Sequence, residues 1–310
     1  MIVISSNSIG EYGPFVATIG FFDGVHTGHR YLIEQVKSEA SKRSLPSAVV
    51  TFPVHPRKVL NKAYQPALLC GYEEKIERLA GTGIDYCIVL DFTPEISQLT
   101  AEDFMHNILK EQLGVDTLII GYDHRFGRNR AEGFSNYTEY GKRMNMTVLQ
   151  SSEMSLSEHV SSSRIRRLLG SGYVEKAAKL LGYNYSISGK IIEGFKIGRT
   201  IGFPTANIKA WEDFKVIPAF GVYAVLVHVE GETYQGMLYI GKKPTVQNSD
   251  NITLEVNIFD FDEDIYNKSL SVEFIEFVRV DKKFPDIEAL KFQITRDKET
   301  IKEIFQQKRW

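Results

Sequence analysis

Two histidines near the start of the chain are spaced to act on one point. His26 and His29 lie three residues apart in the segment Gly20–His29, which joins an expected strand to an expected helix. The first turn of a helix has free N–H groups and a partial positive charge, so it attracts phosphate. Two imidazoles there could donate to charge developing on a phosphate chain, and Gly28 would let the backbone come close. The same pair could instead bind a metal or simply begin the helix.

A second candidate anion site begins with three serines. Residues 161–163 are serines that precede an expected helix, as N-cap residues do. Arg164 and Arg166 fall in its first turn. An arginine at this place opposes the helix dipole unless an anion is near. Taken alone, the segment fits an ordinary capped helix with a solvated basic face equally well.

A glycine-rich stretch in the second half of the chain could fold around phosphate. Gly189 and Lys190 are followed by residues 198–207, which read G-R-T-I-G-F-P-T-A-N. Glycines let a loop direct several N–H groups at one anion. Thr205 and Asn207 place two oxygens at i and i+2, on one face of an extended chain, and hard oxygen ligands suit Mg²⁺. Read alone, a stretch with Gly and Pro is most often a simple turn.

Glu255 is the catalytic candidate of this half. In the expected strand Ile252–Phe259 it shares one face with Thr253 and Asn257, and its direct neighbours are apolar. Without further information, a solvent-facing strand glutamate explains the same pattern better.

The elements that must position the first two sites alternate between strands and helices. Strands are expected at residues 15–20, 48–52, 86–90, 117–120 and 146–149, and helices at 28–43, 73–80, 101–113 and 133–143. This alternation predicts parallel βαβ units and a doubly wound α/β domain. Such a domain binds ligands at the carboxyl ends of its strands.

After Gly182 the strands follow one another directly. Val222–Val229 and Thr233–Ile240 flank a three-residue turn, which predicts a hairpin, and strands at 252–259 and 270–278 come next. A last helix carries an apolar stripe formed by Ile287, Leu290, Ile294, Ile301 and Ile304. Antiparallel strands with one helix predict a β-barrel covered by that helix. We therefore predict two domains, residues 1–182 and 183–310.

The composition agrees with two globular domains and argues against membrane, secreted, collagenous and disordered proteins. The 310 residues contain 43% apolar side chains, and 37 Lys+Arg against 39 Asp+Glu give a formal net charge of -2. The chain has no excess of basic residues, so its charge gives no indication of a nucleic-acid partner. Cys70 and Cys87 are the only cysteines, which favours a reducing, cytoplasmic compartment over a disulfide framework. We expect no membrane span, because no apolar run approaches roughly 20 residues, and no signal peptide.

The first two candidate sites together resemble the nucleotidyltransferase superfamily. The string G-F-F-D-G-V-H-x-G-H is narrower and is similar to the FMN adenylyltransferase module of bacterial FAD synthetases, and residues 51–56, 90–93 and 121–127 also match. The resemblance implies that His26, His29 and Arg166 stabilise phosphate charge. It implies nucleotide or flavin binding at Gly20, Phe21, Asp23, Gly24, Gly28, Asp123, Ser162 and Ser163. His124 stands where the family most often has Phe.

The string G-R-x-x-G-F-P-T-A-N resembles the riboflavin kinase signature, and residues 221–224, 241–246 and 254–261 match the same family. The resemblance implies that Glu255 accepts the riboflavin 5′-hydroxyl proton and that Thr205 and Asn207 hold Mg²⁺. It implies substrate binding at Gly189, Lys190, Gly198, Arg199, Gly202, Phe203, Pro204, Thr205, Asn207 and Arg279. The chain departs from the usual family residues at Tyr239, Asn257 and Asp281.

Together the resemblances cover roughly residues 12–300 and imply a bifunctional enzyme. It would phosphorylate riboflavin with ATP to FMN, then adenylylate FMN with a second ATP to FAD and pyrophosphate, with Mg²⁺ assisting. We expect small-molecule substrates, no nucleic-acid or membrane partner, a cytoplasmic location and a monomer or weak oligomer. Two alternatives remain. One is a monofunctional adenylyltransferase with an inactive kinase module, which the three departures suggest, and the other is a non-enzymatic flavin-binding protein.

Overall fold

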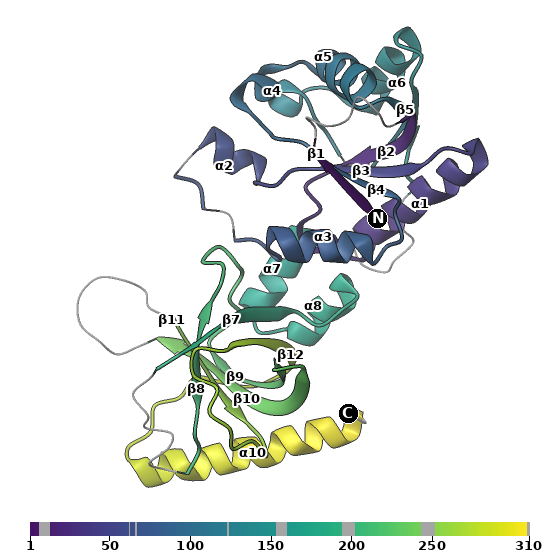
Figure 1. Cartoon of the computed structure of the whole chain (residues 1–310). Helices are drawn as coiled ribbons and strands as arrows, with labels where there is room; N and C mark the ends of the chain where they lie inside the picture. Colours follow the sequence, from purple (N-terminus) through teal and green to yellow (C-terminus); the bar gives the residue numbers. More distant parts are fainter. Residues whose placement is uncertain are drawn as a thin grey trace. The chain divides into compact units, whose positions relative to one another are not determined.

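The structure, a computed structural model, divides into two compact units, Met1–Ser162 and Ser163–Trp310 (Figure 1). It describes residues 1–5, 13–61, 63–65, 67–122, 124–152, 160–193, 202–242 and 252–308. Each unit has a sheet of its own, one parallel and one closed into a barrel.

The first unit contains a parallel sheet of six strands in the order β1-β4-β3-β2-β5-β6. The strands are β1 (Ile2–Ser5), β2 (Phe15–Ile19), β3 (Ser47–Thr51), β4 (Tyr86–Val89), β5 (Val115–Ile120) and β6 (Thr147–Gln150). The chain passes from β2 through β3 to β4 and then crosses to β5 on the other side of β2. The carboxyl ends of β2 and β5 therefore flank the topological switch point of the sheet.

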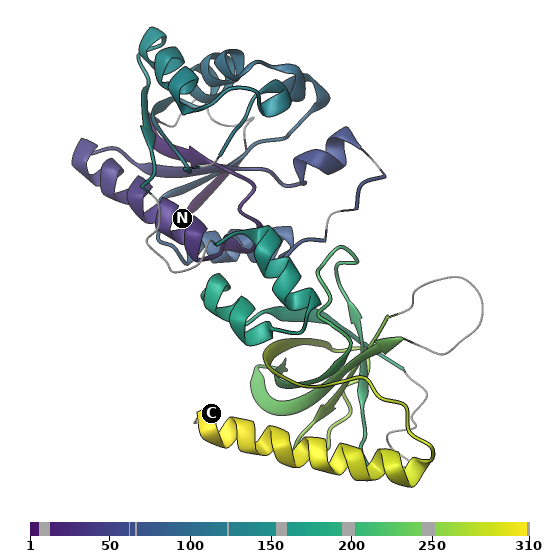
Figure 2. The same ribbon diagram turned by 180° about the vertical axis from the view of Figure 1, so that it is seen from behind.

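Helices cover both faces of this sheet (Figures 1 and 2). The helices described in this unit are η2 (Asp23–Val25), α1 (Thr27–Arg43), α2 (Pro56–Leu60), α3 (Tyr72–Ala80), α4 (Pro94–Gln98), α5 (Ala101–Asp103), η3 (Phe104–Gln112), η4 (Arg128–Arg130) and α6 (Phe134–Arg143). On one face, α1 and α3 bury Ile33 and Leu79 against Val16. On the other, η3 and α6 bury Leu109 and Tyr137 against the alternate strand residues. The two apolar cores are those of a doubly wound α/β domain, which confirms the predicted fold class.

The expected strands and helices of this half are all present. The structure adds β1, an edge strand on which Ile2 and Val3 are exposed. It also adds the short helices α2 and α4, each of which has a proline at its start. A helix of five residues covers little more than one turn, so it shows no 3.6-residue period from which it could be predicted.

The second unit contains a closed antiparallel barrel in the order β10-β11-β8-β7-β12-β9. The strands are β7 (Ser186–Ile192), β8 (Ala206–Ala210), β9 (Gly221–Val229), β10 (Glu232–Lys242), β11 (Ile252–Ile258) and β12 (Ser269–Val280). The barrel closes because β9 pairs with both β10 and β12. The buried rings of Tyr223 and Phe274 meet edge to face with centroids 5.1 Å apart. The predicted β-barrel is confirmed.

One long helix, α10 (Ile287–Lys308), packs on β9, β10 and β12. Ile301, Ile304 and Phe305 are buried against this face. The predicted apolar stripe is wrong at its start, where Ile287 is 60% exposed. Only the later turns of the helix therefore contribute to the core.

Two further helices, α7 (Ser162–Gly170) and α8 (Val174–Leu181), precede the barrel. Between them Gly172 has a φ of +82° and lies against the ring of Phe277. Ala219 N donates to Leu169 O at 3.0 Å, and α8 packs on β12. These contacts group residues 163–182 with the barrel, whereas the change of pattern in the sequence predicts a boundary near Gly182.

Candidate active sites

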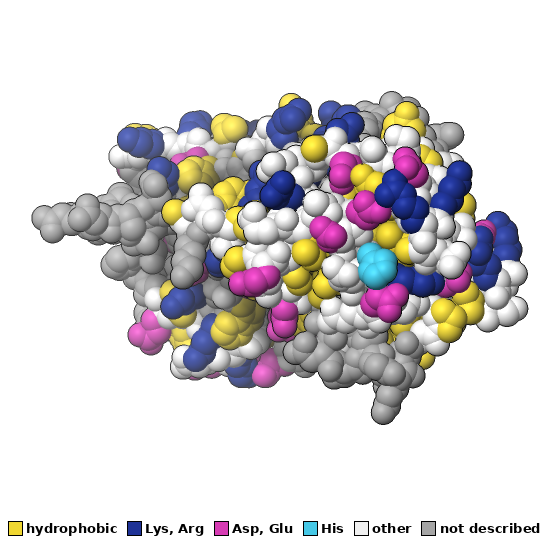
Figure 3. Space-filling model, turned by 90° about the horizontal axis from the view of Figure 1, so that it is seen from above, with side chains coloured by type: hydrophobic (Ala, Val, Ile, Leu, Met, Phe, Trp, Pro, Cys, Tyr) yellow, Lys and Arg dark blue, Asp and Glu magenta, His cyan; other side chains and the backbone are white. Residues whose placement is uncertain are grey.

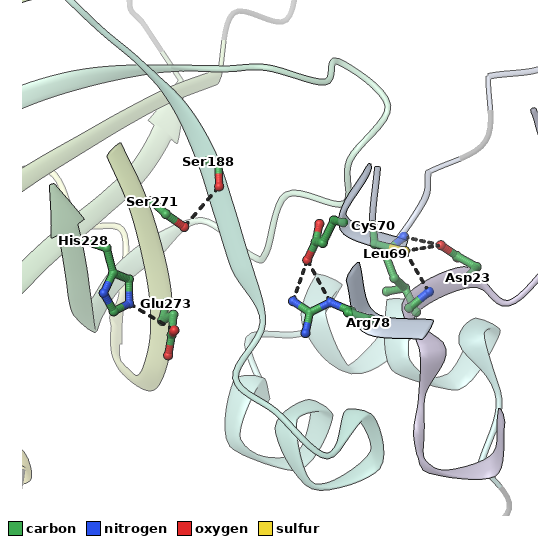
Figure 4. Close-up of polar contacts among 10 residues, drawn as sticks. Asp23, Leu69, Cys70, Arg78, Ser188, His228, Ser271 and Glu273 are labelled. Atoms are coloured by element: carbon green, nitrogen blue, oxygen red, sulfur yellow. Dashed lines mark hydrogen bonds and ion pairs between the residues drawn. The ribbon is translucent and has the colours of Figure 1, made fainter. Parts of the chain in front are cut away.

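The loop after β2 is held by groups from distant parts of the first unit. The carboxylate of Asp23, which is 4% exposed, accepts a hydrogen bond from Leu69 N at 2.8 Å. Gly24 N donates to the sulfur of Cys70 at 3.1 Å, and Figure 4 shows Leu69 and Cys70 beside Asp23. Ser162 Oγ donates to Asp23 O at 3.1 Å. This last bond brings together the two segments that the sequence singled out in this half.

These contacts hold a strained turn. Phe22, Gly24 and Val25 have φ angles of 55°, 77° and 38°, in the left-handed region that is least favourable for a β-branched residue such as valine. Strain of roughly 1–3 kcal/mol per residue persists only where the surroundings fix the backbone, and it concentrates at functional sites. The φ of 77° therefore explains why position 24 is a glycine, which adopts this angle without steric cost.

His26 and His29 lie side by side where α1 begins. His26 is the N-cap residue, and its Nδ1 accepts a hydrogen bond from His29 N at 3.3 Å. The two rings stack with centroids 3.6 Å apart and 14° between their planes. A neutral His26 that accepts at Nδ1 carries its proton on Nε2, so it can donate from that atom. A Cβ on Gly28 would come within 3.3 Å of the His26 ring, so glycine leaves room for the pair.

His29 is neutral near pH 7. Burial, and then the nearby His26, His124 and Lys75, hold the pKa of His29 well below its ordinary value of 6.5. Its Nδ1 is buried and has no hydrogen-bond partner in the described part of the chain. A neutral imidazole donates or accepts according to its tautomer. The pair therefore suits hydrogen bonding to phosphate oxygens without adding two like charges.

The histidines lie at the carboxyl end of β2, beside the switch point between β2 and β5. The loop after β5 begins at the same edge of the sheet, and its His124 is close enough to affect the pKa of His29. Ligands of doubly wound sheets bind in the crevice at this place. The topology therefore supports a ligand site at the turn.

In the second unit, Glu255 lies between two polar side chains of neighbouring strands. It is opposite Asn207 on β8 and Tyr239 on β10, and directly opposed residues of antiparallel strands point to one side of the sheet. Thr253 Oγ1 donates to Glu255 Oε1 at 3.2 Å. Tyr239 packs against the cluster that contains the buried side chains of α10. The register thus aligns three polar groups on the α10 side of the barrel.

Tyr239 and Asp281, two of the departures from the riboflavin kinase pattern, are bonded to each other. Tyr239 Oη donates to Asp281 Oδ1 at 3.1 Å. Burial and the charges of Asp281 and Glu255 raise the pKa of Tyr239 to about 12, so the phenol keeps its proton. A Cβ on Gly241 would collide with the Tyr239 hydroxyl, which explains that glycine. The two departures therefore form one local unit beside Glu255.

Arg279 on β12 is held by α10. Its guanidinium pairs with Asp297, which is 3% exposed, at 2.8 Å from Nη2 and at 2.9 and 3.0 Å from Nε. Gln293 Nε2 donates to the same carboxylate at 2.8 Å. Arg279 and Tyr239 are both opposite Val222 on β9. The ion pair therefore fixes α10 on the face of the barrel that carries Glu255.

The segment before β8 forms one wall of a cavity. Asn257 Nδ2 donates to Pro204 O at 2.6 Å, which fixes the backbone next to Thr205. A cavity of about 340 Å³ opens beside Thr205, and Phe261 and residues 262–266 also line it. This volume is sufficient for a small ligand. The third departure, at Asn257, thus anchors the predicted kinase segment.

Gly189 has a packing role in the barrel. It lies within β7 next to Lys190, and a Cβ there would come within 2.3 Å of Lys209 O on β8. Glycine inside a strand often marks such a close approach of two backbones. The structure therefore explains this glycine without a ligand.

The remaining predicted site residues fall into two sets. Those in described segments are Gly20, Phe21, Ser163, Arg166, Gly202 and Phe203. Those outside the described residues are Asp123, Gly198 and Arg199. The binding roles of both sets stay predictions.

Sequence reasoning missed three groups at the sites. Leu69 and Cys70 hold the turn from a segment without periodicity. Lys75 is buried in α3. It lies four residues before Leu79 on the apolar face of that helix, and a lysine at such a position could have indicated a buried charge. The acidic and aromatic run of residues 260–266 directly follows β11 and could have marked the cavity wall.

Two family models match the chain in succession. The model described as FAD synthetase matches residues 10–164, and the model described as riboflavin kinase matches residues 181–305. The first match contains the histidine turn, and the second contains Asn207 and Glu255.

Curated relatives have the same arrangement over nearly their whole length. A protein of Listeria monocytogenes is 38% identical over 292 residues, which are 94% of this chain and 92% of that protein. A protein of Haemophilus influenzae is 38% identical over 290 residues, 93% of each. Both are named bifunctional riboflavin kinase/FMN adenylyltransferase. The chain belongs to this family.

A solved structure shares the fold of this member of the bifunctional riboflavin kinase/FMN adenylyltransferase family. It is a crystal structure of a protein of Streptococcus pneumoniae described as a macrolide-efflux protein, with a TM-score of 0.88 and 30% identity over 97% of this chain and 99% of that chain. Within the described ranges of the present chain, each helix is too short or too polar to cross a membrane.

Proposed function

We propose that the barrel unit makes FMN and that the α/β unit converts it to FAD. The chain is a transferase with riboflavin kinase and FMN adenylyltransferase activities, and its substrates are ATP and flavins. The observation that carries the assignment of steps is that each family match contains one candidate site. His26 and His29 lie in the FAD synthetase match, and Glu255 lies in the riboflavin kinase match.

In the kinase step, Glu255 accepts the proton of the riboflavin 5′-hydroxyl. The hydroxyl oxygen bonds to the γ-phosphorus of ATP, the bond from that phosphorus to the β,γ-bridging oxygen breaks, and ADP leaves. The proposal is supported by the register between Asn207 and Tyr239 and by the bond from Thr253, which together orient the carboxylate. A positioned base typically contributes about 10²–10⁴-fold.

Mg²⁺ fits the oxygen donors of this site. Thr205 lines the cavity, and Asn207 is opposite Glu255. The described ranges contain no group of three or more His, Cys, Asp or Glu that could hold a metal by themselves, and Mg²⁺ commonly takes few protein ligands and shares water and substrate phosphates. When bound, it would neutralise charge on phosphate oxygens. We propose Thr205 and Asn207 as its protein ligands.

ATP of the kinase step enters the cavity beside Thr205. Asp262, Glu263 and Asp264 also line this cavity. Carboxylates repel phosphate but accept hydrogen bonds from amino and hydroxyl groups. The base and ribose therefore lie beside these carboxylates, and the phosphates lie beside Thr205.

In the adenylyltransferase step, the FMN phosphate attacks the α-phosphorus of ATP and pyrophosphate leaves. The nucleophile is already an anion, so no general base is required. His26 and His29 donate to phosphate oxygens, which their place at the helix start supports. Ser163 and Arg166 stabilise the same phosphate charge. Their role is supported by the sequence motif and by the bond from Ser162 to the turn.

The test is incubation of the purified chain with riboflavin, ATP and Mg²⁺, with products separated by chromatography. We expect FMN first and then FAD. Conversion of supplied FMN to FAD with riboflavin left unchanged would favour a monofunctional adenylyltransferase. Flavin binding that is indifferent to ATP, without turnover, would favour a non-enzymatic flavin-binding protein.

The remaining expectations concern domains, partners and location. We propose the boundary between the catalytic domains at residues 182 and 183, close to residue 181, where the riboflavin kinase match begins. On the face seen in Figure 3, basic and acidic side chains are interspersed, in keeping with the formal net charge of -2. The absence of a nucleic-acid partner, the cytoplasmic location and the monomer or weak oligomer stay predictions.

A further inference from the structure

Lys75 is a buried lysine for which the two reactions give no role. It lies on α3 and is 2% exposed. Burying an ammonium group is costly unless it is hydrogen-bonded or paired. An apolar residue at this position would extend the apolar face that Leu79 begins. The contacts of Lys75 should therefore explain why a charge is kept there.

The ammonium group ties together the ends of two neighbouring strands. Lys75 Nζ donates to Phe52 O at 2.6 Å and to Phe21 O at 3.3 Å, and it lies 4.2 Å from the centroid of the Phe21 ring. Phe21 follows β2 and Phe52 follows β3, and these strands pair directly in the sheet. Hydrogen bonds from a charged donor are stronger than neutral ones.

Phe21 is the residue before the strained turn. The next residue, Phe22, has a φ of 55°, and its ring meets the ring of His29 at 5.2 Å. Thr51 Oγ1 also donates to Phe21 O, at 3.3 Å. Phe21 therefore has a fixed carbonyl and a fixed ring, and its position determines where the turn begins.

We propose that Lys75 is a positioning residue of the adenylyltransferase step, which holds Phe21 and Phe52 and thereby sets the turn that presents His26 and His29 to phosphate. This inference rests on the roles proposed above for the two histidines. A shift of about 1 Å in a reacting group can cost about 10²-fold. Loss of the ammonium should therefore affect the chemical step more than substrate binding.

The charge of Lys75 gives a second readout. Asp23 on η2, Cys70 before α3, Cys87 on β4 and His29 on α1 surround it. Burial lowers the pKa of Lys75 to about 8, while burial raises the pKa of Cys70 to about 12 and of Cys87 to about 11. The thiols keep their protons through the range in which Lys75 loses one. The FAD-forming rate should therefore fall above pH 8 in the native protein.

The experiment compares Lys75→Met, Lys75→Arg and the native full chain. The rate of FAD formation from FMN and ATP is measured across this pH range, with FMN formation from riboflavin as the internal control. Lys75→Met should lower kcat by about 10- to 100-fold, change KM by less than about threefold and lose the alkaline decline. Lys75→Arg, always charged, should restore much of the rate without that decline. Lys37→Met is the matched control, because Lys37 Nζ also donates to a backbone carbonyl, Thr82 O, at 2.8 Å.

Hydrogen–deuterium exchange supplies a measurement besides activity. Lys75→Met should speed exchange in residues 20–29 and 52–56 and leave β5 and β6 unchanged. Faster exchange throughout the first unit would overturn the proposal, since Lys75 would then be a general stabiliser. An unchanged rate, a retained alkaline decline, or no gain in Lys75→Arg over Lys75→Met would overturn it too.

His29→Ala in the same assay separates the proposal from the function on which it rests. If both Lys75→Met and His29→Ala form FAD at the native rate, the proposed role of the turn fails. If only His29→Ala is impaired, the turn is catalytic and the inference about Lys75 alone is wrong.

Discussion

The two candidate sites place their polar groups by different means. In the α/β unit, His26 and His29 follow a turn with three left-handed residues, and side chains from other segments hold it. In the barrel unit, Glu255, Asn207 and Tyr239 are aligned by strand register, and each lies within a regular strand. One site is a strained loop fixed by individual contacts, and the other is part of a sheet ladder.

This difference predicts different sensitivities. A strained turn depends on each contact that compensates its strain, so changes outside the ligand site should impair it. A register is shared by many backbone hydrogen bonds, and a single side chain contributes little to it. Substitutions in the barrel should therefore matter mainly where a side chain touches substrate.

The largest expected effect is loss of the kinase base. Glu255→Gln keeps the shape but removes the basicity, so FMN formation should fall by about 10²–10⁴-fold, while FAD formation from supplied FMN stays unchanged. Initial rates of each step check this. Glu273→Gln is the control in the same barrel, where Glu273 pairs with His228 at 3.0 Å and should retain both rates. A native kinase rate in Glu255→Gln would show that the base is wrongly assigned.

The reverse pattern is expected at the turn. His29→Ala should lower FAD formation by about 10²–10³-fold, as removal of a donor to developing charge does, and leave the kinase step intact. His106→Ala, at a residue whose side chain bonds to the neighbouring Asn107, is the control. Equal loss of both activities would contradict a local role for His29.

A smaller effect should follow from the side-chain contact that anchors the kinase segment. Asn257→Ala removes the bond to Pro204 O, worth about 0.5–1.5 kcal/mol. We expect KM for ATP in FMN formation to rise by about 2- to 10-fold. Ser188→Ala, which removes a hydroxyl contact to Ser271 at 3.1 Å, is the control. An unchanged KM would show that sheet register alone positions Thr205.

The smallest effect is on stability below neutral pH. Because burial lowers the pKa of His29 in the folded state, the unfolded chain takes up the proton first, below 6.5. The contribution of neutral His29 to the free energy of unfolding is complete above pH 6.5, and it is lost as the pH falls towards the pKa of His29 in the folded state. Urea unfolding at about pH 7.5 and about pH 5.5 should show a smaller loss in His29→Asn than in the native chain. An equal loss in both would contradict burial of this imidazole.

The fold could be predicted because it depends on local pattern. Hydrophobic periodicity located most strands and helices of the first half and four strands and the last helix of the second, but not α8, β7 or β8, and it separated the parallel from the antiparallel half. It failed at Ile287, since an apolar stripe does not show how far the partner surface extends. The contacts of Asp23 could not be predicted from the sequence either, because Leu69 lies 46 residues away in the chain.

The sequence by itself determined two units, their order, and the motifs that predict phosphate binding, because these depend on short stretches and on spacing. Only the tertiary structure decided that Tyr239 is opposite Glu255 and that Lys75 is buried under the turn. Strand register and the burial of a charge depend on contacts between residues far apart in the chain, and no local pattern records them.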